Sequence, residues 1–238
     1  MDKNEFSRTE LLIGTTNLNK LKTAKIIVFG VGGVGGFVVE GLIRSGVENI
    51  TIVDNDKVNI TNINRQIIAL HSTIDKDKVD VMEERILNIN NNAKVTKYKM
   101  FYLPENKNMI NLCEYDYVID CIDTITAKLS IIEDCYNNNI KIISCMGMGN
   151  KINPLDIKIN DIFKTTVCPL ARTIRYELRK RNIKKLKVCY STEEPIKANA
   201  KEENDIKRSV PGSISFVPSV AGLIIASEVI KDICNLKK

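Results

Sequence analysis

The chain has 238 residues, 44% of them hydrophobic and 27% charged, which is the balance of a globular protein and excludes a largely disordered one. Its net charge of +6 permits an anionic partner without requiring one. The N-terminal segment contains no apolar leader, and Glu228, Lys231 and Asp232 interrupt the last apolar stretch, so we expect a cytoplasmic protein without a membrane span.

Apolar runs and helical periodicity divide the first half of the chain into alternating elements. Residues 1–24 are predicted to form a helical lead-in, with Leu11, Leu12, Leu18 and Leu21 available for packing. Residues 25–150 are predicted to form a Rossmann-like nucleotide-binding core, with strands at 25–29, 49–53, 94–100, 117–122 and 140–145 and helices at 37–45, 78–90 and 127–138. This alternation predicts an α/β fold with a doubly wound, mostly parallel sheet.

The second half of the chain has a weaker pattern. Residues 151–238 are predicted to form a smaller extension for substrate binding and dimerisation, within a single domain that spans residues 1–238. Strands at 155–159 and 186–190, a helix at 169–180 and a final helix from about Ser219 are expected in this extension. The polar and charged stretch 193–208 is expected to be a mobile loop.

A glycine-rich turn follows the first predicted strand. It reads Gly30-Val31-Gly32-Gly33-Val34-Gly35, which has the pattern G-x-G-x-x-G, and Asp54 follows the second strand. Glycines let the backbone approach phosphate oxygens, the helix N-terminus offers free N–H groups, and a strand-end carboxylate accepts hydrogen bonds from a ribose. The alternative is a tight structural turn beside an ordinary aspartate. The order of the elements favours a nucleotide site, although an NAD-dependent oxidoreductase would show the same features.

Charged residues farther along the chain distinguish nucleotidyl transfer from hydride transfer. A nucleotidyl transfer builds negative charge on the phosphates, which Arg65 and Lys78 are suited to stabilise as catalytic residues. Asp123 follows another predicted strand and is placed to hold Mg²⁺ on the phosphates, as a third catalytic residue and metal ligand. Singly, the two cations are equally consistent with solvated surface charges and Asp123 with a helix N-cap. Their order along the chain favours function.

These residues stand in stretches that resemble the superfamily of ubiquitin-like-protein activating enzymes and their bacterial relatives ThiF, MoeB and HesA. The stretches are GVGGVGG, IVDND, NINRQ, DKDKVDVMEERI and DCIDT. The resemblance implies a homodimer that binds ATP with Mg²⁺, and SRTELLIG resembles the family's N-terminal arginine motif, whose arginine enters the partner's site. The implied ATP-binding residues are Gly30, Gly32, Gly33, Asp54, Asn62, Arg65, Gln66, Lys78, Asp123 and Arg8 of the partner subunit.

A closer resemblance is to one branch, the tRNA threonylcarbamoyladenosine dehydratases. It rests on FSRTELLIG, TNINRQIIALHSTIDKDKV, VIDCIDTITAK, KTTVCPLART and FVPSVAGLI and extends over nearly the whole chain. It implies an ATP-dependent dehydration, in which the threonylcarbamoyl group on adenosine 37 of tRNA is activated as an acyl-adenylate and cyclises. The pattern departs at Cys168, where this branch is expected to carry Asp.

Two features of the residues agree with this branch. The seven scattered cysteines include no C-x-x-C pair, whereas activators of sulfur-carrier proteins usually carry paired C-x-x-C zinc motifs. Arg172, Arg175 and Arg179 fall on one face of the predicted helix 169–180 and are the candidate tRNA-binding residues, because an arginine face suits RNA phosphates. An ordinary solvated face is the alternative for this helix.

Three other functions remain open at this point. The first is a ThiF- or MoeB-type adenylyltransferase that activates the C-terminal carboxylate of a sulfur-carrier protein. The second is an NAD-dependent oxidoreductase, and the third is a nucleotide-binding scaffold without enzymatic activity. A cysteine-desulfurase or sulfur-acceptor system as a further partner also stays open.

Overall fold

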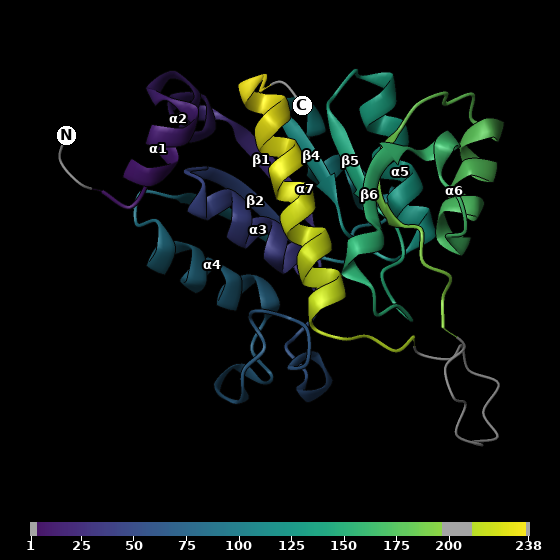
Figure 1. The fold of residues 1–238 in the computed structure, drawn as a ribbon, viewed down its shortest axis with the longest axis horizontal. Helices are drawn as coiled ribbons and strands as arrows, with labels where there is room; N and C mark the ends of the chain where they lie inside the picture. Colours follow the sequence, from purple (N-terminus) through teal and green to yellow (C-terminus); the bar gives the residue numbers. More distant parts are fainter. Residues whose placement is uncertain (1–3, 197–210, 237–238) are drawn as a thin grey trace.

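The computed structural model describes residues 4–196 and 211–236 and contains a seven-stranded sheet (Figure 1). The strand order is β3-β2-β1-β4-β5-β7-β6, and each neighbouring pair is parallel except β6 with β7. The doubly wound, mostly parallel fold is therefore confirmed. The strands are β1 Lys25–Phe29, β2 Asn49–Val53, β3 Lys94–Tyr98, β4 Tyr117–Asp120, β5 Ile142–Cys145, β6 Ile157–Asp161 and β7 Lys187–Ser191.

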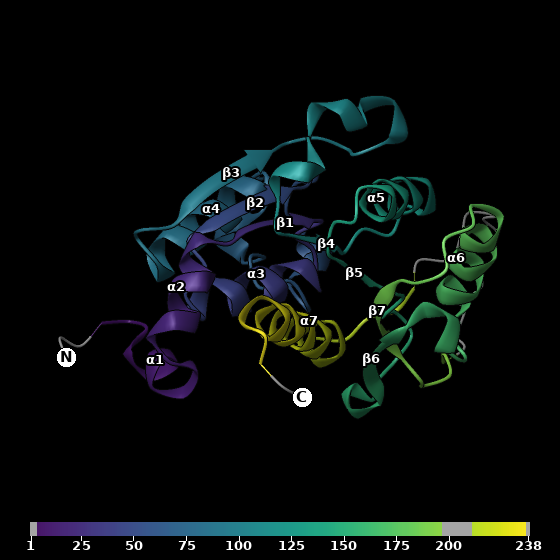
Figure 2. The same ribbon diagram turned by 90° about the horizontal axis from the view of Figure 1, so that it is seen from above.

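Helices cover both faces of the sheet, as Figure 2 shows. On one face lie α3, α4 and α7, and on the other lie α5 and α6. The crossover helices are apolar toward the sheet, since Val38, Leu42 and Ile43 of α3 are fully buried. The helices are α1 Ser7–Ile13, α2 Thr15–Thr23, α3 Gly35–Arg44, α4 Lys78–Ile89, α5 Ile125–Asn137, α6 Pro169–Lys180 and α7 Phe216–Cys234.

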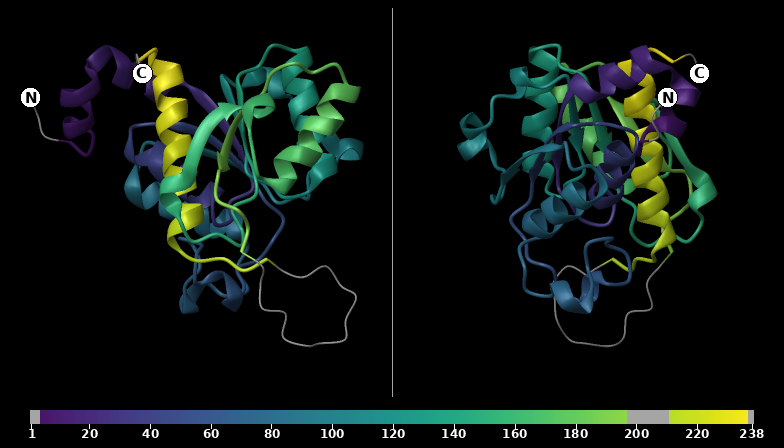
Figure 3. Two further views of the ribbon diagram at one scale, coloured as in Figure 1. Left: turned by 45° about the vertical axis from the view of Figure 1, so that its right-hand side comes forward. Right: turned by 90° about the vertical axis from the view of Figure 1, so that its left-hand side faces the viewer.

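The helical lead-in forms, but only part of it packs as expected. Leu18 and Leu21 of α2 are buried, whereas Leu11 and Leu12 of α1 are 80% and 85% exposed. The latter two are therefore not packed in the chain's own core, although their apolar side chains remain available for packing. The reason is geometric, because α1 projects from the body of the molecule and packs on α2 (Figure 3).

The residues after 150 add two strands to the same sheet. β7 pairs with β5 and carries β6 at the edge. β6 begins at Ile157 rather than residue 155, because Pro154 lies in a short 3₁₀ turn that Asn153 caps. α7 begins at Phe216, before the expected Ser219, because a proline in the first turn of a helix loses no intrahelical hydrogen bond. Most of the expected loop 193–208 lies outside the described residues.

The final helix α7 lies against α3 through glycine contacts. A Cβ at Gly41 of α3 would lie 2.8 Å from Cβ of Ala226, and one at Gly222 of α7 would lie 2.5 Å from the carbonyl oxygen of Val34. The two helices approach this closely only because these side chains are absent. Across the described residues, no helix is both long and apolar enough to span a membrane.

Substituting Gly222 by alanine is expected to destabilise the protein by forcing α7 away from α3. The new methyl group would lie 2.7 Å from Cβ of Phe37 as well as against the Val34 carbonyl. Overpacking costs about 1–3 kcal/mol, and alanine recovers roughly 1 kcal/mol of this as the better helix former. Urea denaturation should show a lower midpoint for Gly222→Ala and little change for Ser227→Ala, an exposed position on the same helix. Equal midpoints would contradict the tight contact.

Candidate active site

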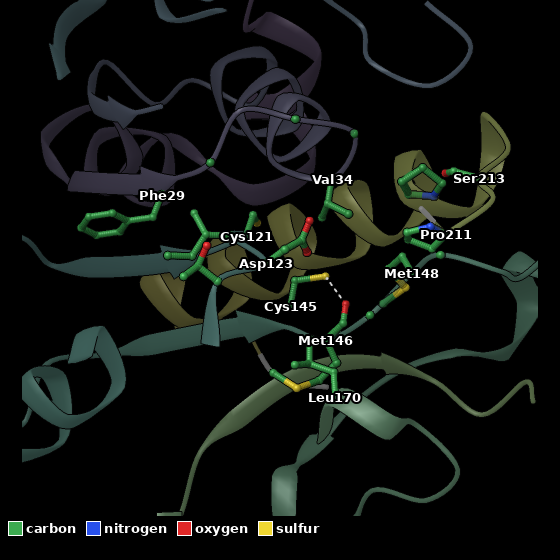
Figure 4. Close-up of a pocket in the computed structure, with 18 of the residues that line it drawn as sticks. Phe29, Val34, Cys121, Asp123, Cys145, Met146, Met148, Leu170, Pro211 and Ser213 are labelled. Carbon is green, nitrogen blue, oxygen red and sulfur yellow. Dashed lines mark hydrogen bonds between the residues drawn. The ribbon is translucent and has the colours of Figure 1, made fainter. Parts of the chain in front are cut away.

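A cavity of about 800 Å³ opens at the carboxyl edge of the sheet (Figure 4). Residues that follow β1, β2, β4 and β5 line it, together with the start of α6 and the segment before α7. This is the edge where ligands bind in doubly wound folds, because the strand ends and helix N-termini meet there. Phe29 lies at one end of the view and Pro211 and Ser213 lie at the other.

The glycine turn after β1 is fixed by backbone contact. Gly30 has φ of +84°, and a Cβ at Gly35 would lie 1.8 Å from the carbonyl oxygen of Gly30, so neither position accepts a side chain. Gly32 and Gly33 both line the cavity, and a Cβ at Gly32 would meet nothing closer than 3.8 Å. Gly30 and Gly35 therefore shape the turn and Gly32 leaves room for a ligand, whereas a Cβ at Gly33 would lie 3.3 Å from Cβ of Pro218.

Asp54 links the second strand to this turn. Its carboxylate accepts hydrogen bonds from the backbone N–H of Val31, at 2.8 Å, and of Asp56, at 2.9 Å. Burial raises the pKa of Asp54, while the nearby Lys78 ammonium and the two N–H donors act in the opposite direction. The Nζ of Lys78 lies 2.7 Å from the Asp56 carboxylate and 3.9 Å from that of Asp54. Carboxylate and ammonium thus share one end of the cavity.

The segment 60–66 supplies the other predicted phosphate contacts. Asn62 accepts the N–H of Asn59 at 3.0 Å, which holds the turn, and Arg65 donates to the carbonyl of Thr61 and the side chain of Asn64, both at 2.9 Å. Within the described residues, Arg65 has no carboxylate partner within 4.0 Å. Its charge is therefore available to a ligand, as phosphate binding requires.

Gln66 gives an independent indication of a ligand. Its side-chain oxygen is buried and has no hydrogen-bond partner in the part of the chain that the structure describes. Buried polar atoms without a partner are rare, and a ligand that donates a hydrogen bond would satisfy this one. A nucleotide on the glycine turn fits these residues, since Gln66 lines the same cavity as Gly32.

Asp123 follows β4 and lies in the middle of the cavity, between Val34 of the glycine turn and Cys145 (Figure 4). It is exposed, and Thr124 rather than Asp123 is the N-cap residue of α5. Among the residues described, no three His, Cys, Asp or Glu side chains come together as a metal site. A single carboxylate suits Mg²⁺ that is held chiefly by nucleotide phosphates.

A buried ion pair lies beneath the turn that carries Asp123, and the sequence pattern did not predict it. The side chains of Lys128 and Asp120 are 0% exposed, and their Nζ and Oδ2 atoms lie 2.7 Å apart. Ser144 donates to the same carboxylate oxygen at 2.6 Å, and Lys128 also donates to the carbonyl of Cys145 at 2.9 Å. The only available indication was a lysine on the apolar face of a predicted helix, where burial requires a carboxylate partner.

The cavity continues past the predicted nucleotide residues into a part that we call the substrate compartment. Sequence reasoning missed it, because its residues come from loops that the fold alone brings together. Cys168, the N-cap residue of α6, is 2% exposed and lines it. The substrate compartment comprises Met146, Met148, Lys151, Cys168, Leu170 and Pro211.

The remaining predicted residues lie outside this cavity. Arg172 and Arg179 are exposed on α6, with the Arg179 guanidinium 5.7 Å from the centre of the Phe163 ring. Arg175 is half-buried and donates to the carbonyl of Thr165 at 3.1 Å, so its guanidinium holds the preceding turn. Arg8 is exposed on α1 and does not line the cavity of its own chain.

Comparison with known proteins agrees with the fold and the cavity. A model of the ThiF family matches residues 6–238. The chain belongs to the ThiF family. The resemblance seen in the sequence is thereby confirmed.

Relatives within the ThiF family are most similar in one branch. A tRNA threonylcarbamoyladenosine dehydratase of Bacillus subtilis is 44% identical over 96% of this chain and 94% of its own length. The Escherichia coli enzyme of that name is 38% identical over 74% of this chain and 66% of its own. An adenylyltransferase and sulfurtransferase of Candida glabrata is 30% identical over 63% of this chain and 34% of its own.

Solved structures that resemble this chain include members of the same branch. The Escherichia coli tRNA N6-threonylcarbamoyladenosine dehydratase in complex with ATP has a TM-score of 0.87 and 32% identity over 97% of this chain and 94% of that one. A structure named TcdA (CsdL) has a TM-score of 0.89 at 33% identity, with the same coverage. These matches favour an adenylylating enzyme over an oxidoreductase and do not favour a sulfur-carrier activator.

Replacing Lys128 by methionine should destabilise the protein by about 3–5 kcal/mol, because Asp120 would be left as an unpaired buried carboxylate. Adding Asp120→Asn should recover part of the loss, since removing both charges costs less than removing one. Urea denaturation of the two single variants and the double variant measures the coupling. Strictly additive losses would contradict the pairing of these two side chains.

Proposed function

We propose that this protein catalyses the ATP-dependent dehydration of N6-threonylcarbamoyladenosine at position 37 of tRNA through an acyl-adenylate. The observation that carries the proposal is the 44% identity, over nearly the full length of both chains, to a dehydratase of that name. The cavity supports it, because a nucleotide-binding end and an adjoining substrate compartment form one continuous space. Activation of a carboxylate by ATP needs the two ligands side by side.

In the proposed reaction, the residues of the chain bind the nucleotide and offset its negative charge, and none of them acts as a nucleophile. Gly32 and Gly33 leave space for the phosphates, Asp54 accepts hydrogen bonds from the ribose, and Arg65 and Lys78 stabilise the leaving pyrophosphate. Asn62 and Gln66 complete the nucleotide site, while Gly30 shapes it. Asp123 would hold Mg²⁺, which neutralises phosphate charge when bound.

The bonds of the proposed reaction balance without an enzyme nucleophile. A carboxylate oxygen of the substrate bonds to the α-phosphorus of ATP as pyrophosphate leaves. The carbamoyl group of the same substrate then bonds to the activated acyl carbon, loses a proton, and AMP leaves with the former carboxylate oxygen. The carboxylate is ionised at neutral pH and requires no general base for the first step. Cys168 has no part in these steps.

The basic face of α6 is the proposed tRNA-binding surface. The helix begins at the cavity, where Pro169 and Leu170 form part of the lining, and runs away from it to Lys180. RNA phosphates along Arg172, Arg175 and Arg179 would therefore place one nucleotide at the cavity mouth. The first and third of these arginines are more exposed than Arg175, whose guanidinium already binds Thr165.

Dimerisation is proposed through the projecting helix α1. Leu11 and Leu12 present apolar side chains to solvent there, which a second copy of the chain would cover. Arg8 lies on the same helix and lines no part of its own cavity. In this arrangement, Arg8 of the partner subunit reaches the ATP phosphates.

Dehydration itself is measured by mass spectrometry of nucleosides from modified tRNA incubated with the protein, ATP and Mg²⁺. The wild-type protein should remove one water from the modified nucleoside. Lys78→Ala and Asp123→Ala should reduce the rate at least about a hundredfold, as the loss of groups that stabilise developing phosphate charge does. Lys25 lies at the amino end of β1, whereas the cavity lies at the carboxyl end, so Lys25→Ala should retain activity. ATP binding without dehydration in the wild-type protein would refute the proposal.

Mixing two inactive variants tests the role of Arg8. Arg8→Ala removes the group that acts in trans, and Lys78→Ala removes one that acts within the chain's own cavity. Random pairing of the two variants gives half heterodimers with one intact site each, so about a quarter of wild-type activity should return. The activity of mixtures is measured against total protein concentration. Failure of the mixture to exceed either variant alone would place Arg8 outside the site.

A further inference from the structure

Among the described residues that line the cavity, one cation is not used by the proposed nucleotide site. The lysines and arginines that line it are Arg65, Lys78 and Lys151. The first two serve the phosphates in the proposed function. Lys151 lies in the loop after β5, in the substrate compartment, and is 3% exposed. A buried ammonium in a ligand cavity needs a physical explanation, because desolvating a charge is costly.

Within the described residues, the hydrogen bonds of the Lys151 ammonium include none to a carboxylate. Its Nζ donates to the backbone carbonyl of Glu193. The carboxylate of Glu193 is directed elsewhere, because it accepts the N–H groups of Ile152, at 3.0 Å, and Asn153, at 2.9 Å. Among residues 4–196 and 211–236, no carboxylate lies within 4.0 Å of the Lys151 ammonium. Burial lowers the pKa of Lys151.

In the part of the chain that the structure describes, two other lysines are buried, and both have a carboxylate partner. Lys128 is paired with Asp120 at 2.7 Å, and Lys78 is paired with Asp56 at the same distance. Both therefore have a carboxylate that offsets the loss of hydration. Within residues 4–196 and 211–236, Lys151 instead donates to a neutral carbonyl, and the carboxylates of Glu193 and Asp156 act on it from more than 4.0 Å away. An anion that enters the compartment would give this ammonium a direct partner.

The walls of the compartment limit which anion fits. Met146, Met148 and Leu170 present apolar side chains to the cavity, and Pro211 closes it on the side of α7 (Figure 4). Apolar walls suit a base and a short aliphatic group rather than a second polyphosphate. A single ammonium matches a single carboxylate. The ligand that these features describe is an organic carboxylate with an apolar body.

The loop that carries Lys151 is tied to the nucleotide end of the cavity. Gly212 donates its N–H to the side chain of Asn150 at 2.6 Å and accepts the N–H of Asn150 at 2.7 Å. One residue farther on, the carbonyl of Ser213 accepts a hydrogen bond from Asn64, at 3.0 Å, and Asn64 in turn contacts Arg65. These bonds fix Lys151 relative to the residue that faces the phosphates.

We propose that Lys151 binds the carboxylate of the substrate nucleoside and positions it for attack on the α-phosphorus. This inference rests on the proposed function and adds a substrate-binding residue to it. The ammonium donates a hydrogen bond to one carboxylate oxygen and leaves the other oxygen free to form the bond to phosphorus. After AMP transfer it faces the acyl oxygen, on which negative charge develops when the ring closes.

The test measures binding of two synthetic anticodon stem-loop RNAs, one with threonylcarbamoyladenosine at position 37 and one with its methyl ester. The ester keeps the shape of the ligand and removes its charge. With a non-hydrolysable ATP analogue present, the wild-type protein should bind the acid about ten- to a hundredfold more tightly than the ester, the range for hydrogen bonds to charged groups. Lys151→Met should bind the two RNAs equally, because the partner charge is gone.

Two further variants control for charge and fold. Lys151→Arg should keep much of the preference for the acid, because it restores the cation. Lys25→Met removes one positive charge at the amino end of β1, away from the cavity, and should keep the full preference for the acid. In steady-state kinetics, Lys151→Met should raise KM for the modified RNA more than KM for ATP.

The outcomes separate this inference from the proposed function. If the wild-type protein dehydrates the modified nucleoside but Lys151→Met keeps the acid-to-ester preference, the role of Lys151 is wrong and the proposed function stands. If Lys151→Met weakens the acid, the ester and the ATP analogue equally and lowers the melting temperature, Lys151 only ties the loop to Glu193. Absence of dehydration by the wild-type protein would instead refute the proposed function.

Discussion

The backbone contact between Gly30 and Gly35 is the constraint on which the rest of the cavity depends. Because no Cβ fits between them, the chain turns from β1 into α3 within a few residues, and the N–H of Val31 reaches the carboxylate of Asp54. That bond joins the ends of β1 and β2, the two strands that hold the nucleotide residues. The same turn places Val34 against Gly222, so α7 also takes its position from it.

Two of the buried lysines in the described residues differ in whether a carboxylate pairs with their charge. The pair formed by Lys128 and Asp120 is fully compensated and holds the ends of β4 and β5 together beneath the turn that carries Asp123. The ammonium of Lys151 lies in the neighbouring loop, and no carboxylate of residues 4–196 or 211–236 forms an ion pair with it. A folded chain tolerates an uncompensated charge best where function uses it, because the ligand then offsets the cost of burial.

The sequence predicted features that depend on a single segment and missed features that depend on contacts between distant segments. The bounds of α6 were correct, since its apolar residues and leading proline lie within one segment. Arg65, Lys78 and Asp123 were identified by spacing, and the fold places them along one cavity. Lys151 was missed, because its burial depends on segments before α7 and after β7. Leu11 and Leu12 were predicted only to be available for packing, since periodicity shows that a face is apolar but not what covers it.

The segment Pro211–Ser213 is a wall shared by the two proposed ligand sites. On one side it bonds to Asn64, next to Arg65, and on the other it bonds to Asn150, next to Lys151. Binding at one site that orders this wall lowers the entropic cost of binding at the other. Thermodynamic reciprocity then requires that nucleotide and nucleoside raise each other's affinity by the same factor. Cooperativity of this kind between two different ligands would disfavour hydrolysis of ATP by water when the nucleoside is absent.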